Sequence, residues 1–80
     1  MKIEILLFGI TTDLLGASSI ALELAKNSTV AHLKLELANN YPPFQKLESY
    51  AVAVNETYAI DAVTLKPNDI VAIIPPVSGG

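Results

Sequence analysis

The residues with the clearest chemical potential are Gly79 and Gly80, which follow the run Pro75-Pro76-Val77-Ser78. Two prolines fix φ and lack the N–H that a sheet needs, so they should lead the chain away from the last predicted strand in an extended form. Glycines have no side chain and can pass through a narrow tunnel in another protein. We therefore expect a β-rich domain over residues 1–76 and a flexible tail over residues 77–80.

The chemistry expected of this tail belongs to its terminal carboxylate. That group is ionised at neutral pH and can attack the α-phosphate of ATP. An acyl-adenylate formed in this way accepts a sulfur or amine nucleophile, which a free carboxylate does not. A frayed end or a cloning remnant would explain the two glycines, but not the stiff Pro75-Pro76 that continues from the preceding apolar segment.

The rest of the chain contains neither an ATP-binding motif nor a thiol. No GxxxxGK[ST] or GxGxxG occurs, and cysteine is absent. The single histidine, His32, has Ser28 four residues before it, and we expect it to be a solvated helix residue. One histidine without cysteine predicts no metal site. ATP chemistry and sulfur must therefore come from partners.

The composition of the chain argues against two classes of partner, nucleic acids and membranes. The chain has 80 residues, 51% of them hydrophobic, with five Lys, no Arg, eight acids and a net charge of −3. A nucleic-acid binder normally has a basic face and uses arginine, and an anionic membrane surface also attracts basic residues. The apolar runs Ile5–Phe8 and Ile70–Val77 are far shorter than the roughly 20 residues that span a bilayer. We expect a cytoplasmic protein that binds neither nucleic acid nor membrane.

Apolar periodicity predicts the elements that position the tail. Alternation indicates strands at Lys2–Phe8, Ser19–Leu24, Tyr50–Val54, Tyr58–Ile60 and Asp69–Ile74. After a cap at Ser28 or Thr29, a 3.6-residue period over Val30, Leu33, Leu37 and Tyr41 indicates one helix, which Pro42-Pro43 ends. The order predicts an α+β fold with a mixed four- to five-stranded sheet and one main helix on one face.

Three segments resemble the small subunit of molybdopterin synthase, the MoaD family. They are the terminal run preceded by residues 68–74, the mid-chain Ala53-Val54-Asn55-Glu56, and an opening strand that ends at Phe8 and leads to Asp13-Leu14-Leu15-Gly16. The resemblance covers essentially the whole chain and implies a ubiquitin-like β-grasp fold. It also implies a non-catalytic sulfur carrier without an active site of its own.

The resemblance further implies a reaction sequence. An E1-like adenylyltransferase activates the Gly80 carboxylate with ATP, and a sulfur-donor protein converts the acyl-adenylate to a thiocarboxylate. The tail, with Gly79 beside the reacting group, then enters the large subunit of molybdopterin synthase. There it gives sulfur to cyclic pyranopterin monophosphate, within a heterotetramer. No cofactor is expected on this chain, because ATP is used by the activating partner.

Members of this family bury an apolar patch against both partners, and the resemblance carries this role onto Phe8, Tyr58 and Ile74, together with Pro75, Pro76, Val77 and Ser78. Strand parity independently places Phe8 and Ile74 on the sheet face opposite the helix, together with Leu6. Many members have Arg or Lys where this chain has Thr12. Local contacts with a partner are therefore expected to differ there.

Three alternatives remain. A thiamin-pathway sulfur carrier (ThiS-like) shares the fold and the Gly-Gly end, but it is usually shorter and lacks the diproline. A ubiquitin-like modifier would use the Gly80 carboxylate to form isopeptide bonds. A plain β-grasp interaction domain would keep its activity after deletion of Gly79-Gly80.

Overall fold

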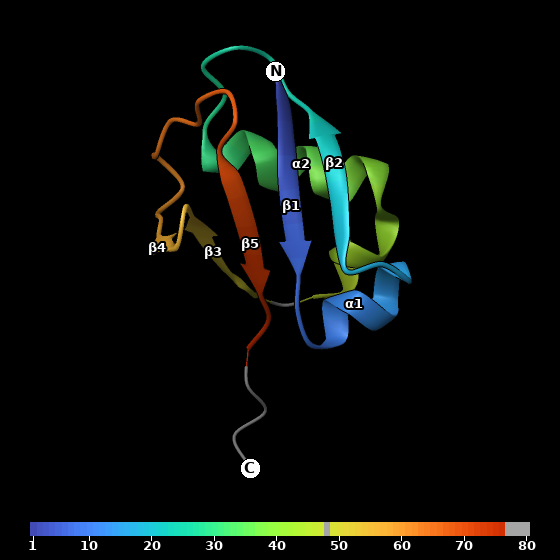
Figure 1. The fold of residues 1–80 in the computed structure, drawn as a ribbon. Helices are drawn as coiled ribbons and strands as arrows, with labels where there is room; N and C mark the ends of the chain where they lie inside the picture. The colour runs from blue at the N-terminus through green and yellow to red at the C-terminus, as the bar shows by residue number, and fades with distance from the viewer. Residues whose placement is uncertain (48, 77–80) are drawn as a thin grey trace.

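The computed structural model describes residues 1–47 and 49–76, which form one sheet backed by one long helix (Figure 1). The elements in chain order are β1 (Lys2–Leu7), α1 (Ile10–Leu15), β2 (Ser19–Glu23), α2 (Val30–Asn40), the 3₁₀ helix η1 (Pro42–Lys46), β3 (Ala51–Val54), β4 (Thr57–Tyr58) and β5 (Ile70–Ile74). The five strands lie in the order β2-β1-β5-β3-β4. This confirms the predicted α+β architecture.

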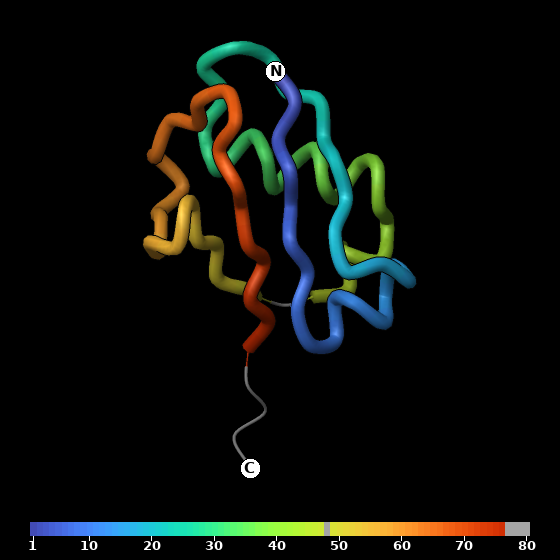
Figure 2. The backbone as a smooth tube through the Cα atoms, in the orientation of Figure 1, coloured from blue at the N-terminus to red at the C-terminus, as the bar shows by residue number. Residues whose placement is uncertain are grey.

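The central pair of strands comes from the two ends of the described chain. β1 and β5 run parallel and side by side, whereas the other neighbouring pairs are antiparallel (Figure 2). Ile5 is paired with Val71 and Leu7 with Ile73. Because β5 lies in the middle of the sheet, the point where it ends is held by strands on both sides.

The core lies between the sheet and α2. One face of each of the longer strands supplies its side chains, and α2 supplies Val30, Leu33 and Leu37, all fully buried. The buried strand residues on the face toward α2 are Ile3, Ile5, Leu7, Leu22, Val52, Val71 and Ile73. Leu65, in the long connection before β5, is 1% exposed and belongs to the same core.

Thr29 caps α2, and His32 completes the cap. The Thr29 hydroxyl accepts the His32 backbone N–H at 3.3 Å, and His32 Nδ1 accepts the Thr29 backbone N–H at 3.0 Å. This reciprocal capping box satisfies two backbone donors that have no partner within the helix. His32 is exposed, as predicted, but it has a structural role that the sequence reading missed.

The strand bounds and the segment after α2 differ slightly from the prediction. β3 begins at Ala51 rather than Tyr50, and β4 ends at Tyr58 rather than Ile60. Pro42 and Pro43 end α2 as expected, and they also begin η1, which the sequence did not predict. Proline suits the first turn of a helix, where its missing N–H has no partner to lose.

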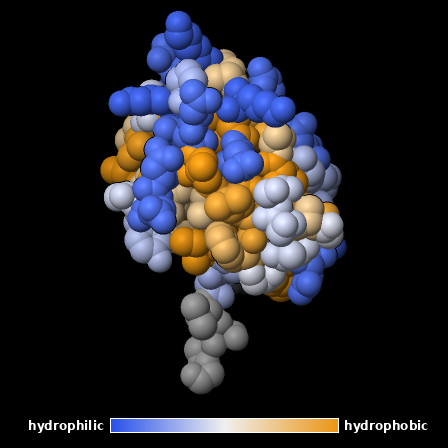
Figure 3. Space-filling view, viewed as in Figure 1, coloured by the Kyte–Doolittle hydropathy of each residue, from blue (hydrophilic) through white to orange (hydrophobic). Residues whose placement is uncertain are grey.

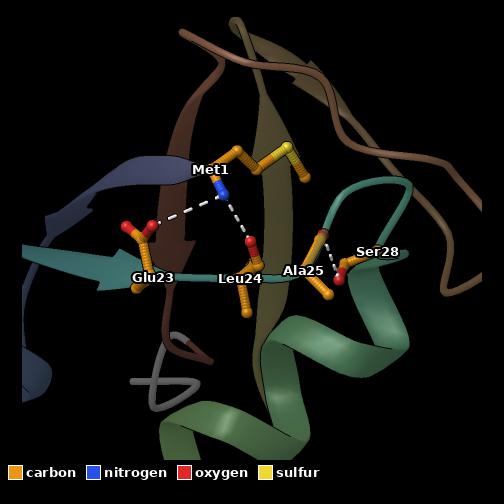
Figure 4. Close-up of polar contacts among 5 residues, drawn as sticks. All are labelled: Met1, Glu23, Leu24, Ala25 and Ser28. Carbon is orange, nitrogen blue, oxygen red and sulfur yellow. Dashed lines mark hydrogen bonds and ion pairs between the residues drawn. The ribbon is translucent and has the colours of Figure 1, made fainter.

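The corner between β2 and α2 closes the end of the sheet opposite to the end of β5 (Figure 4). The Met1 carbonyl accepts the Leu24 N–H at 2.8 Å, and the Met1 amino group lies 2.5 Å from the Leu24 carbonyl and 3.6 Å from a Glu23 carboxylate oxygen. The Ser28 hydroxyl donates to the Ala25 carbonyl at 2.7 Å. These bonds hold the turn that precedes the helix cap.

Candidate functional site

One face of the sheet has no helix over it, and we call it the open face. The strand pairing places Leu6 beside Ala72, Ala72 beside Ala53, and Ala53 beside Tyr58. Paired residues have side chains on the same side of a sheet, so these four form one row across the open face. The two alanines leave room between the larger side chains at the ends of the row.

Apolar side chains gather on this face. Phe8 is 49% exposed, Tyr58 72% and Ile70 43%. Figure 3 shows apolar atoms across the middle and lower part of the face, with hydrophilic atoms at its upper end. A shallow hollow of about 410 Å³ lies here, lined by Leu6, Phe8, Asn55, Glu56, Ile70 and Ala72. We call the apolar residues Leu6, Phe8, Tyr58, Ile70, Ala72 and Ile74 the open-face patch.

Hydrogen bonds fix the position of Phe8, the first residue after β1. Its backbone N–H donates to the Thr11 hydroxyl at 3.0 Å, and that hydroxyl donates to the Phe8 carbonyl at 2.5 Å. Thr11 is fully buried, so these bonds are protected from water. The exposed ring of Phe8 therefore projects from a rigid turn.

Asn55 and Asp69 hold the β3–β4 turn against the start of β5. Asn55 donates to Asp69 at 2.9 Å and accepts the Ile70 N–H at 3.0 Å. Asn55 and Glu56 both have positive φ, 49° and 71°, as a tight two-residue hairpin turn requires. Glu56 consequently brings a carboxylate to the rim of the apolar hollow.

Residues 1–47 and 49–76 contain no cluster of three or more His, Cys, Asp or Glu side chains that would hold a metal ion. They also contain no helix long and apolar enough to cross a membrane. Residues 77–80, including the predicted reactive Gly79 and Gly80, lie outside the described residues.

The structure places the predicted contact residues as strand parity requires. Phe8 and Ile74 follow the open-face alternation of β1 and β5, and Tyr58 lies at the far edge on β4. Pro75 is half-buried and Pro76 exposed at the end of β5. Binding through these residues, and through Val77 and Ser78 outside the described part, stays a prediction.

The sequence reading left out two members of the patch, Ile70 and Ala72. The signal was available, because both have the same parity as Ile74 in β5. The predicted strand Asp69–Ile74 contains both residues, but only Ile74 was predicted as a contact residue. Pairing with β1 shows that Ile70 and Ala72 lie beside Glu4 and Leu6.

The five-stranded mixed sheet, its single covering helix and its apolar open face define a ubiquitin-like β-grasp protein. SAMP1 from Haloferax volcanii superposes with a TM-score of 0.89 at 21% identity, covering 100% of both chains. A putative molybdopterin converting factor subunit 1 from Pyrococcus furiosus gives 0.87 at 24% identity, covering 96% of this chain and 99% of the other. One chain of a complex of subunits 1 and 2 of molybdopterin-converting factor from Helicobacter pylori gives a TM-score of 0.71 at 22% identity, covering 100% of this chain and 100% of that chain.

Sequence comparison then identifies the family. The ThiS family model matches residues 5–80, so the chain belongs to the ThiS family. The molybdopterin synthase sulfur carrier subunit of Arabidopsis thaliana is 35% identical over 81 residues, covering 100% of this chain and 84% of the relative. Its counterpart in Dictyostelium discoideum is 37% identical over 83 residues, covering 99% of this chain and 96% of the relative.

Proposed function

We propose that this chain is the sulfur carrier subunit of a molybdopterin synthase. The observation that carries the proposal is the full-length similarity to two molybdopterin synthase sulfur carrier subunits, which extends to the end of the sequence. The thiamin-pathway alternative shares the family and the fold. The named relatives and the Pro75-Pro76 stem favour the molybdopterin pathway over it.

The reaction at Gly80 takes place in three steps on this proposal. A carboxylate oxygen attacks the α-phosphorus of ATP at the activating enzyme, and pyrophosphate leaves. A hydrosulfide ion released by the donor protein then adds to the acyl carbon, and AMP leaves with the electron pair of the broken C–O bond. The thiocarboxylate finally transfers its sulfur to cyclic pyranopterin monophosphate, and water restores the carboxylate.

The open-face patch is the surface that we assign to the large subunit and to the E1-like adenylyltransferase. It is exposed, apolar and continuous with β5, which leads into the tail. A partner that covers the patch thereby receives the tail at its own active site. The solved Helicobacter pylori complex of subunits 1 and 2 supports a partner of this kind.

ATP and the sulfur donor are supplied by the partners on this proposal, and the carrier itself binds no cofactor. Because the pathway enzymes must meet this chain repeatedly, we place all of them in the cytoplasm. The carrier contributes a stable docking surface and a terminal carboxylate. Neither contribution requires a general base or a metal ion on this chain.

The decisive experiment is the intact mass of the protein after incubation with a cognate E1-like enzyme, ATP and a sulfide source. We expect a gain equal to the replacement of one oxygen by sulfur, localised to the C-terminal peptide. Gly80→Ala should unfold at the same denaturant concentration as the wild type yet transfer sulfur much more slowly. Equal transfer by this variant would contradict a narrow partner channel around the terminus.

The remaining outcomes separate the alternatives. Conversion of cyclic pyranopterin monophosphate by the sulfur-loaded chain and the large subunit supports the molybdopterin pathway. Loading without that conversion supports the thiamin pathway. Higher-mass isopeptide conjugates indicate a modifier. If the mass does not increase although the same enzyme loads another carrier, the chain is a plain interaction domain.

A further inference from the structure

Gly9 lies between β1 and α1 in a backbone conformation that only glycine adopts readily. Its φ is 57° and its ψ is −134°. That combination lies outside the three regions open to residues with a Cβ, including the left-handed helical region. The turn therefore requires glycine at this position for backbone reasons alone.

Pro75 fills the space above Gly9. It is the first residue of the Pro75-Pro76 segment that leads into the tail, which we call the tail stem. A Cβ built on Gly9 would lie 3.1 Å from Cγ and 3.9 Å from Cδ of Pro75. At 3.1 Å two carbon atoms overlap, so any side chain on Gly9 would push the proline ring away by a few tenths of an ångström. The ring of Pro75 thus sits directly against the bare backbone of the turn.

The turn that receives Pro75 is rigid. The Thr12 N–H donates to the Gly9 carbonyl at 3.1 Å, and the buried Thr11 hydroxyl bonds to both backbone groups of Phe8. Proline has a fixed φ, so the contact at its ring restricts the direction in which the chain leaves β5. The same turn therefore sets both the position of the Phe8 ring and the direction in which the tail begins.

We propose that Gly9 is a positioning residue for sulfur transfer, which it serves by seating the Pro75 ring and so aiming the tail stem. This inference rests on the proposed function. The reacting carboxylate at Gly80 must reach a fixed point in a partner while the open-face patch is docked. A displaced stem changes the direction in which the tail enters the partner, and even a small misplacement of reacting atoms slows an enzymatic step.

A second glycine in the same segment supplies the matched control. Gly16 also has a positive φ of 66°, but a Cβ built there meets no atom within 4 Å. Gly16→Ala therefore introduces backbone strain near α1 without touching the tail stem. A purely structural effect of strain in this segment should appear in both alanine variants.

The experiment is a double-mutant cycle with Gly9→Ala, Pro75→Ala and the pair, with Gly16→Ala alongside. The readouts are kcat and KM of thiocarboxylate formation by the E1-like enzyme, together with the denaturant midpoint. Gly9→Ala should lower kcat about tenfold with KM within about twofold, since the docking patch is retained. Gly16→Ala should lose stability but keep the wild-type kcat.

Coupling between the two residues decides the mechanism. If Gly9 acts through the Pro75 ring, Gly9→Ala should slow the Pro75→Ala background by less than about twofold. Rate effects that simply multiply, or equal rates for Gly9→Ala and Gly16→Ala, would overturn the proposal. If Gly9→Ala does not fold, Pro75→Ala alone must still slow kcat, and a wild-type rate for it refutes the role of the ring.

A measurement on the wild-type protein separates this inference from the proposed function. A nuclear Overhauser effect between the Gly9 Hα and the Pro75 ring protons is expected whether or not sulfur is carried. Its absence, with sulfur loading intact, refutes only the role of Gly9. Its presence in a chain that an active E1-like enzyme fails to load refutes the proposed function.

Discussion

At the scale of single residues, Thr11 is a buried polar side chain whose hydroxyl both accepts and donates a hydrogen bond. It accepts the Phe8 N–H and donates to the Phe8 carbonyl while it is itself 0% exposed. Thr11→Val keeps the shape but leaves the Phe8 N–H without that acceptor, and we expect the free energy of unfolding to fall by about 1–3 kcal/mol. Urea unfolding measures this.

Thr11→Ser is the matched control because it retains the hydroxyl and loses one methyl group. Removal of one buried methyl group costs on the order of 1 kcal/mol. Phe8 should nevertheless keep its wild-type chemical shifts in the serine variant and lose them in the valine variant. Equal stability of the valine variant and the wild type would show that the hydroxyl bonds contribute nothing net.

Tyr50 has a raised pKa, above its ordinary value of 10.0, because burial disfavours the phenolate and the charge of Asp61 adds to this effect. The unfolded chain therefore ionises this group first as the pH rises. Its contribution to stability is full below pH 10 and is lost as the pH rises through the folded-state pKa.

Tyr50→Phe should consequently flatten the fall in unfolding free energy above pH 10, because phenylalanine does not ionise. Tyr58→Phe, at a side chain that is 72% exposed, is the matched control and should leave the fall unchanged. Unfolding curves in urea at a series of pH values from 8 to 11.5 test both variants. Identical curves for Tyr50→Phe and the wild type would contradict this explanation.

At the scale of elements, α2 depends on its first turn. The sequence left Ser28 and Thr29 as equal candidates for the cap, and the structure assigns the role to Thr29, while Ser28 bonds to the Ala25 carbonyl. Thr29→Ala should lower the free energy of unfolding by about 1 kcal/mol, a typical cost for loss of a cap. Thr29→Ser should keep most of the wild-type stability, because it retains the capping hydroxyl. Thermal unfolding of the alanine and serine variants compares their stabilities.

An alanine variant as stable as the wild type would show that the remaining bonds of the turn suffice. Those bonds include the ones that Val30 and Ala31 donate to carbonyls outside the helix, those of Val63 and Asp61. The serine variant distinguishes loss of the hydroxyl from loss of the methyl group. Only loss of the hydroxyl should shorten the helix by circular dichroism.

Element positions followed from periodicity, whereas element ends did not. The alternation of Ile3, Ile5 and Leu7 and the 3.6-residue period of Val30, Leu33 and Leu37 predicted the buried faces correctly. The extent of β4 and the existence of η1 depend on backbone hydrogen bonds to distant segments. Ala59, for example, donates to Val52 and no longer belongs to a strand.

At the scale of the whole molecule, the open-face patch should bind the large subunit. Phe8→Asp introduces a charge where a partner side chain would exclude water, and we expect an affinity at least about tenfold lower by calorimetry. Leu35→Asp is the matched control, because Leu35 is 63% exposed on α2, on the other side of the sheet. Equal affinity of the Phe8 variant and the wild type would show that the docking surface lies elsewhere.

The sequence by itself determined which apolar faces of β1 and α2 are buried and what the Gly79-Gly80 terminus is suited to do, because both follow from residue types and short-range periodicity. Strand parity also predicted the open face for Phe8 and Ile74. The tertiary structure alone decided the order of the strands, because their pairing joins segments far apart in the chain. It also decided that Gly9 lies against Pro75, since that contact depends on the parallel pairing of β1 with β5, which brings the end of one strand to the end of the other.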